Sequence, residues 1–174
     1  MRKVLLIGVI FVFFPFFSTP ALAESIYVLP YPSYMPGSMF YQVHRRWEAV
    51  SKYWYFGNFS QFTFNLKFSD KYLVEAKTLF EYKQYLYAHE ALIKSDKYFT
   101  NSCTFLSKAK KEGVNTTEKE AMLNEAGNKH IEILQQIKQI VPEIFVWTPE
   151  KVAPTSLFLW EEIDNAIKAR RSCM

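Results

Sequence analysis

The sequence contains few of the residues, and none of the short motifs, from which common catalytic and metal sites are built. It has only five glycines, two cysteines and three histidines among 174 residues. Metal-binding and redox spacings (H-x-x-x-H, H-E-x-x-H, C-x-x-C), the nucleophile motif G-x-S-x-G and a glycine-rich phosphate loop are absent. His44, His89 and His130 fall on three different predicted helices. We therefore predict a non-enzymatic protein and assign no catalytic residue, cofactor or metal site.

The first 23 residues have the pattern of a signal peptide. Arg2 and Lys3 precede an apolar run over 4–17, and Ala21-Leu22-Ala23 forms an A-x-A cleavage site. The run of 14 residues is shorter than the roughly 20 that span a bilayer as a helix. We expect an exported mature chain that begins at Glu24, lies in the periplasm, the cell envelope or outside the cell, and has no membrane span.

Charge gives no indication of a polyanionic nucleic-acid partner. The whole chain has 21 basic and 17 acidic residues, and removal of Arg2 and Lys3 leaves 19 basic residues and a net charge of +2. Nucleic-acid-binding domains carry a much larger basic excess. We therefore expect no nucleic-acid partner.

Helical periodicity dominates the rest of the chain and predicts an all-α bundle of about five helices in a single domain over 38–174. Two apolar seams with four-three spacing lie within 59–111. Their phase slips near residues 81–84, which predicts a tight reversal between two antiparallel helices, with one long bent helix as the alternative. The first seam comprises Phe62, Leu66, Ser69, Leu73, Ala76 and Phe80, and the second Tyr85, Ala88, Leu92, Ser95, Phe99, Ser102, Leu106 and Ala109.

The segment from Ala76 to Leu92 resembles one tetratricopeptide helix pair. It has an aromatic residue before the turn, Tyr85 just after it, and small residues on the second helix. Only one such unit is visible, whereas tetratricopeptide folds stack about three or more. The resemblance therefore implies a local helix hairpin.

Residues 24–37 form an extended arm rich in proline and tyrosine. Pro30, Pro32 and Pro36 disfavour a helix and favour polyproline-like geometry. Two interpretations remain open, a strap laid over the bundle and an exposed arm that binds a partner groove.

Other helices flank the central pair. We expect a first helix from Ser38 to Tyr53, a helix opened by a Thr117–Glu120 capping box with His130 in its core seam, and a last helix capped by Thr155 or Ser156. The expected core-facing residues of the first helix are Phe40, Val43, Trp47 and Val50. Those of the helix that begins near Thr117 are Leu123, Ala126, Ile133, Ile137 and Ile140, followed by Ile144, Phe145 and Trp147 in the connection after it. Those of the last helix are Leu157, Trp160, Ile163 and Ile167.

Cys103 and Cys173 are the two cysteines of a chain that we expect in an oxidising compartment. A disulfide between them would tie the C-terminal tail to the second long helix. Two free thiols are the alternative, because the sequence does not show that the two residues lie close together.

Two stretches occur together in this chain, the arm LPYPSYMPG and the aromatic segment KYWYFGN followed by DKYLVEAKTLFEYKQY. This combination, over about 29–95, resembles an uncharacterised family of exported bacterial proteins from small-genome candidate phyla that is defined only as a domain of unknown function. The resemblance implies export and a helical domain. It implies no activity, substrate or catalytic residue.

The functional hypothesis is an envelope interaction or scaffold module that binds an unidentified protein or peptide in a groove. Its expected contacts are tyrosines of the central helix pair and its flanks: Tyr72, Tyr82, Tyr85, Tyr87 and Tyr98. The alternative is a cell-wall glycan binder that uses an aromatic platform around Trp54 and Tyr55. A wall hydrolase and a holdase chaperone are less favoured alternatives.

Overall fold

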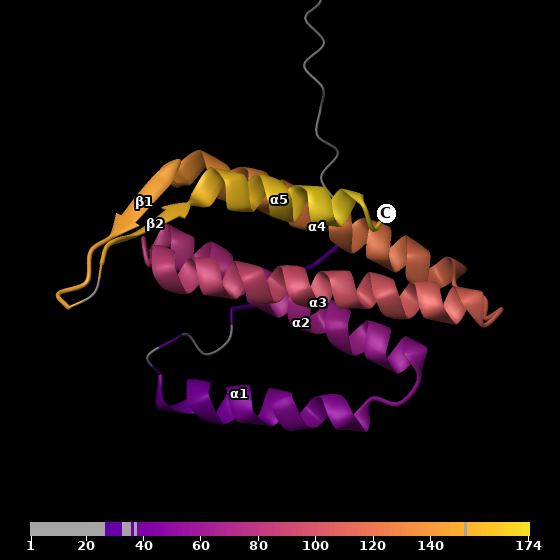
Figure 1. Ribbon diagram of the computed structural model, residues 1–174. Helices are drawn as coiled ribbons and strands as arrows, with labels where there is room; N and C mark the ends of the chain where they lie inside the picture. Colours follow the sequence, from indigo (N-terminus) through magenta and orange to yellow (C-terminus); the bar gives the residue numbers. More distant parts are fainter. Residues whose placement is uncertain (1–26, 33–35, 37, 152) are drawn as a thin grey trace, which may run out of the picture.

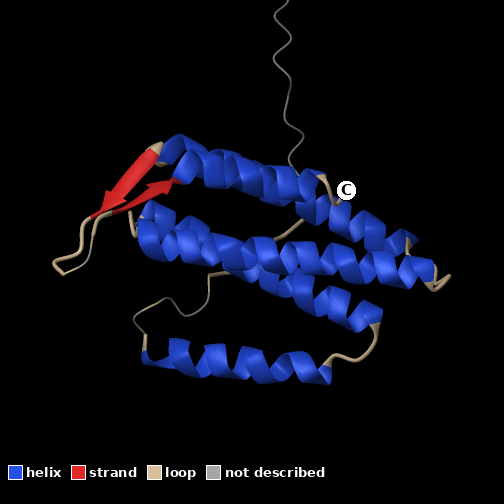
Figure 2. Ribbon diagram, viewed as in Figure 1, coloured by secondary structure: helices blue, strands red, loops and turns tan. Residues whose placement is uncertain are grey.

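The computed structural model describes residues 27–32, 36, 38–151 and 153–174, and the predicted signal peptide lies outside these residues. The described chain is a bundle of five α-helices with one small β-hairpin, which confirms the predicted all-α class (Figures 1 and 2). None of the described helices is long and apolar enough to cross a membrane. The elements are α1 (Met39–Ser51), the 3-10 turn η1 (Lys52–Trp54), α2 (Asn58–Glu81), α3 (Tyr85–Lys111), α4 (Thr117–Ile140), β1 (Ile144–Trp147), β2 (Thr155–Phe158) and α5 (Leu159–Arg171).

The central hairpin is formed by α2 and α3, which are antiparallel and joined by the predicted reversal. No glycine occurs at this turn, and Lys83 adopts the left-handed conformation (φ 59°) that a helix stop requires. The amide of Gln84 donates to the carbonyl of Leu79, and that of Lys83 to Phe80, which completes a Schellman cap. This geometry explains how the two seams change phase without a proline or glycine.

The two predicted seams meet in the core. Every residue of the first seam is buried, and in the second only Tyr85 is partly exposed. Helices α4 and α5 cover this hairpin on the side opposite α1 (Figure 1). The α4 seam is buried from Leu123 to Ile137, whereas Ile140 lies at the exposed end of the helix. The predicted Thr117–Glu120 capping box is wrong, because Thr117 is the first residue of α4. The N-cap is Thr116, whose side chain makes no capping bond to the backbone and donates instead to the Glu120 side chain.

A polar network passes through the core between α2, α4 and the arm. Asp70 accepts a hydrogen bond from the Tyr27 hydroxyl at 2.7 Å and bonds to His130 Nε2 at 2.7 Å. Burial and the charge of Arg170 lower the pKa of His130, whereas its bond to Asp70 opposes that effect. As predicted, His130 is a buried core residue.

A second buried group joins α5 to α3. Arg170 is fully buried at the end of α5, donates to Ser95 Oγ at 2.9 Å and pairs with Asp96. Its guanidinium also lies over the ring of Phe99, 5.3 Å from the centroid. The burial of Arg170 was not predictable from the local sequence, because its acidic partner is 74 residues away in the chain.

The predicted arm is partly visible. Tyr27 and Leu29 pack against the two halves of the bundle core, whereas Val28 and Tyr31 are exposed. The described part of the arm therefore lies on the bundle as a strap. Residues 24–26, 33–35 and 37 of the predicted arm lie outside the described residues.

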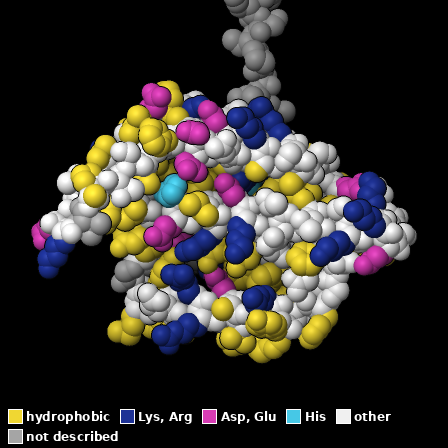
Figure 3. Space-filling view, in the orientation of Figure 1, with side chains coloured by type: hydrophobic (Ala, Val, Ile, Leu, Met, Phe, Trp, Pro, Cys, Tyr) yellow, Lys and Arg dark blue, Asp and Glu magenta, His cyan; other side chains and the backbone are white. Residues whose placement is uncertain are grey.

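The orientation of α1 contradicts the prediction. Its apolar face points to solvent, with Phe40, Val43, Trp47 and Val50 between 51% and 61% exposed. The buried residues of α1 are Tyr41, Glu48 and Ser51, so the polar face of the helix is turned toward the bundle. Figure 3 shows hydrophobic side chains gathered along this edge of the molecule. The physical reason is that the facing surface of α2 offers polar partners to this helix.

The exposed face of α1 leads to a testable expectation about stability. Val43→Ser should change the free energy of unfolding by less than about 0.5 kcal/mol, because exposed side chains contribute little. Leu73→Ala, in the buried seam, should cost about 2–5 kcal/mol. Urea denaturation followed by circular dichroism measures both. A loss of more than about 1.5 kcal/mol for Val43→Ser would show that α1 buries its apolar face in solution.

The connection between α4 and α5 also differs from expectation. It forms the antiparallel hairpin of β1 and β2, in which Phe145 pairs with Leu157. Phe145 packs on the core as predicted, but Ile144 and Trp147 are exposed at 48% and 39%. Helix α5 begins at Leu159, so Thr155 and Ser156 belong to β2 and cap nothing. The same shift moves Leu157 into β2, leaves Trp160 40% exposed, and makes Leu159 a core residue.

Candidate functional site

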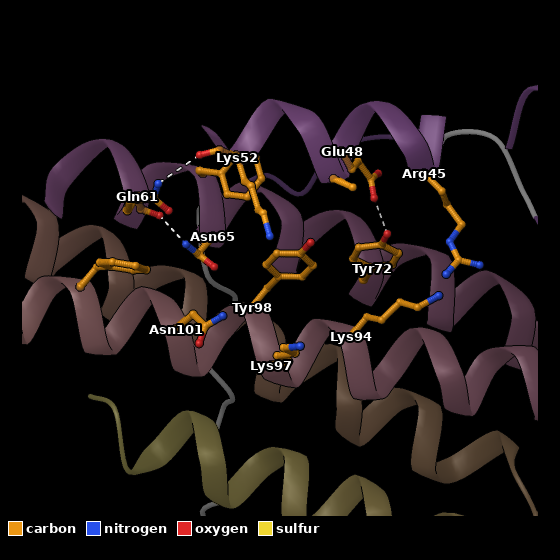
Figure 4. A pocket seen from close by; sticks show the side chains of 13 residues that line it. Arg45, Glu48, Lys52, Gln61, Asn65, Tyr72, Lys94, Lys97, Tyr98 and Asn101 are labelled. Carbon is orange, nitrogen blue, oxygen red and sulfur yellow. Dashed lines mark hydrogen bonds between the residues drawn. The ribbon is translucent and has the colours of Figure 1, made fainter. Parts of the chain in front are cut away.

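A cleft of about 400 Å³ separates α1 and η1 from the α2–α3 hairpin (Figure 4). Its size falls within the range of ligand-binding pockets. The side chains come from four consecutive elements, α1, η1, α2 and α3. The cleft is lined by Arg45, Glu48, Ala49, Lys52, Gln61, Phe64, Asn65, Tyr72, Lys94, Lys97, Tyr98, Asn101 and Phe105.

Polar contacts hold α1 above the cleft. The Tyr41 hydroxyl donates to Glu75 Oε1 at 2.9 Å. Glu48 accepts from Lys71 with one carboxylate oxygen and from the Tyr72 hydroxyl with the other. Burial raises the pKa of Glu75, and the Tyr41 hydrogen bond opposes this rise. These contacts explain why the polar face of α1 points inward.

The floor of the cleft is aromatic. Tyr72 and Tyr98 stack with their rings 5.7 Å apart and 5° from parallel. Phe64 lies beside them, 6.2 Å from the ring of Tyr98. Amide side chains surround this floor, and Asn65 is held by its bond to the Gln61 carbonyl at 2.7 Å. The floor can therefore take an apolar group while the rim offers hydrogen bonds.

Positive charge lines both sides of the cleft. Arg45 and Lys52 come from α1 and η1, and Lys94 and Lys97 come from α3. Figure 4 shows Arg45 and Lys94 at one end of the cleft and Lys52 pointing toward Tyr98. Burial lowers the pKa of Lys94, and the charge of Arg45 lowers it further. Within the described residues, none of the four forms an ion pair.

The structure separates the five predicted partner-binding tyrosines. Tyr72 and Tyr98 lie in the cleft, and Tyr87 lines a smaller cavity of about 160 Å³ that shares Arg45 and Lys94 with it. Tyr85 packs on Phe145 at a centroid distance of 4.7 Å. Tyr82 is 75% exposed at the hairpin turn. Three of the five therefore border one continuous region, and two do not.

The predicted aromatic platform is divided in a similar way. Trp54 is 62% exposed and packs edge-on against Trp47 at 5.2 Å. Tyr55 is turned inward onto Phe64, with a centroid distance of 4.8 Å. The exposed aromatic pair on this surface is thus Trp47 with Trp54.

The pairing of the cysteines is also visible. Cys103 on α3 and Cys173, just after α5, are joined by a disulfide with a Cα–Cα distance of 5.8 Å. In the part of the chain that the structure describes, no three histidine, cysteine or acidic side chains are grouped to hold a metal ion.

The charged residues of the cleft were not among the predicted binding residues. On α3, Lys94, Tyr98, Asn101 and Phe105 follow four-three-four spacing and so share one helical face. That signal was present in the sequence. The opposite wall was not predictable, because it depends on the inward polar face of α1.

Comparison with known protein families gives a match that contains the whole cleft. Residues 33–144 match the domain of unknown function DUF5667. The chain belongs to the DUF5667 family. No curated protein and no solved structure matches it. The sequence resemblance to an uncharacterised domain family is therefore confirmed.

The DUF5667 match extends beyond the predicted 29–95 resemblance and ends at the first residue of β1. It contains every residue that lines the cleft. It does not contain α5, so Arg170 and Cys173 lie outside it. The cleft thus lies within the DUF5667 segment, and α5, which lies outside it, completes the core.

Proposed function

We propose that this protein is an exported, non-enzymatic interaction module of the cell envelope that holds a peptide segment of a partner protein in the cleft. The observation that carries the proposal is the cleft itself, with the stacked rings of Tyr72 and Tyr98 as its floor. Aromatic side chains with a polar group are frequent anchors at protein interfaces.

The dimensions favour an extended segment. The cleft and its neighbouring cavity together follow α3 from Phe105 to Tyr87. Eighteen residues of helix correspond to roughly 27 Å. An extended peptide of about eight residues covers that length. We therefore take an octapeptide as the unit to test.

The chemistry of the lining favours binding over catalysis. Glu48 is the one carboxylate among the lining residues of the cleft, and both its oxygens are engaged, by Lys71 and by Tyr72. A general acid or base needs a carboxyl group that can reach a substrate. The Glu48 carboxylate instead fixes α1 to α2.

Export is supported by the sequence. The charged and apolar pattern of residues 1–23, which lie outside the described residues, is that of a signal peptide. The Cys103–Cys173 disulfide agrees with an oxidising compartment, where such bonds persist.

Selection from a displayed octapeptide library on immobilised Glu24–Met174 tests the proposal. Ala49 is an exposed residue of α1 that lines the cleft, so Ala49→Trp should fill the cleft and abolish binding of the selected peptides. Val50→Trp puts the same side chain on the outward face of α1 and is the matched control. Equal binding by both variants, or no selected peptide at all, would contradict the proposal.

The glycan alternative is favoured by one observation, the exposed pair of Trp47 and Trp54. It predicts co-sedimentation with isolated cell wall that is lost in Trp54→Ala and kept in Ala49→Trp. That result would move the function from the cleft to the outer face of α1. Retention by the wall in neither wild type nor variant would exclude the alternative.

A further inference from the structure

We propose that the cleft selects an acidic peptide, whose carboxylates bridge the cations of the α1 side to those of the α3 side. This inference rests on the proposed function and adds the chemistry of the partner. Two cations stand on each side of the cleft, and Glu48, the one carboxylate among its lining residues, is already engaged by Lys71 and Tyr72. An anionic segment is the occupant that this arrangement lacks.

What distinguishes the four cations is that they line one cleft without an ion pair to a carboxylate of the described residues. Three of them lie over tyrosine rings, Arg45 over Tyr41, Lys52 over Tyr53 and Lys94 over Tyr72. Elsewhere, five lysines pair with an acidic residue within 4 Å: Lys77, Lys110, Lys119, Lys129 and Lys138. The charges of Glu75, Glu90 and Glu48 act on Lys94, but within the described residues none of the four cations forms an ion pair within 4 Å. Their concentration does not follow from general basicity, because the chain without its signal peptide has a net charge of only +2.

Like charges that face each other across a partly desolvated space repel, and an anion between them removes that cost. Glu48 does not do so, because Lys71 already neutralises it. Figure 3 shows Lys and Arg side chains around the hollow above α1. A ligand carboxylate can contact Arg45 and Lys94 at one end, and a second can contact Lys52 and Lys97 nearer the middle.

The floor determines what lies between the carboxylates. The stacked rings of Tyr72 and Tyr98 present an apolar surface between the two cationic positions. In an extended peptide, side chains alternate between two faces, so acidic and apolar residues can address different walls. The complementary ligand is therefore a segment in which acidic residues alternate with aromatic or aliphatic ones.

Bound carboxylates would also fasten α1. This helix buries only Tyr41, Glu48 and Ser51, so few contacts hold it. New bridges from Arg45 and Lys52 to α3 would reduce local opening of the helix, which hydrogen exchange detects. Protection of α1 amides in the presence of ligand is a readout that nonspecific surface binding would not give.

The test uses labelled octapeptides in which three glutamates alternate with aromatic residues, and a counterpart with glutamines in place of the glutamates. Fluorescence anisotropy should show the glutamine peptide binding about tenfold more weakly, with the difference reduced by salt. The glutamate peptide should slow exchange in α1. Inorganic polyphosphate is the control for a generic polyanion.

Lys94→Gln with Lys97→Gln should weaken binding of the glutamate peptide about tenfold and leave the glutamine peptide unaffected. Lys67→Gln with Lys111→Gln removes the same charge from exposed positions outside the cleft and should not change the affinity for either peptide.

Equal affinities for both peptides would overturn acidic selectivity but would not contradict peptide binding. Tighter binding of polyphosphate, with displacement of the peptide, would overturn the peptide as ligand. Binding of neither peptide would contradict this inference, whereas failure of the library selection concerns the proposed function.

Discussion

Replacing Asp70 with alanine should lower the free energy of unfolding by about 3–5 kcal/mol. Asp70 is buried and is the shared partner of Tyr27 on the arm and His130 on α4. Its removal takes the acceptor from the buried His130 and one hydrogen bond from the part-buried Tyr27. A buried polar group without its partner costs more than the net value of the lost hydrogen bond. Guanidinium denaturation followed by circular dichroism measures the change.

Asp164→Ala is the matched control. Asp164 is also an aspartate in a close ion pair, 2.6 Å from Lys138, but its side chain is 47% exposed. Exposed pairs contribute at most about 1 kcal/mol. Similar losses for the two variants would mean that the Asp70 network is hydrated and that the arm is not fixed through Tyr27.

The central hairpin was predictable because its information is local. Apolar residues at four-three spacing fix which side of α2 and α3 is buried, and a change of phase fixes where the chain reverses. The structure buries Leu73 and Leu92, one from each seam, in one core cluster. Only the conformation of the turn was not predictable, because a lysine such as Lys83 gives no sequence signal for the left-handed conformation comparable to that of glycine.

The orientation of α1 was not predictable from periodicity. An amphipathic pattern indicates that a helix has two faces, but the burial of one of them depends on what lies opposite. Here the opposite surface carries Lys71, Tyr72 and Glu75, which bond to the polar face of α1. These partners are 23 to 34 residues away, so no local window contains both sides of the contact.

Contacts between residues far apart in the chain also explain why the β1–β2 hairpin and the cleft were not predicted. The connection between α4 and α5 was not predicted to contain strands. Pro142, Pro149 and Pro154 stand outside β1 and β2 and do not interrupt their pairing. The cleft could be predicted only if the positions of both its walls, α1 and α3, were known. Its α3 face was visible as a spacing of lysine and tyrosine, but that spacing becomes a binding site only with α1 above it.

Removal of the disulfide, by Cys103→Ser with Cys173→Ser, should lower the free energy of unfolding by about 4 kcal/mol, because the bond closes a loop with a separation of 70 residues in the unfolded chain. Reduced wild type should match the double variant in guanidinium denaturation, and reductant should not change the free energy of unfolding of the variant.

The disulfide fixes α5, which lies outside the DUF5667 match, to α3. Arg170, three residues before Cys173, then stays in register with Asp96. Two titratable thiols in unfolded, unreduced protein, with no effect of reductant, would show that the buried residues of α5, Arg170 and Ile163 among them, hold the helix in place without the bond.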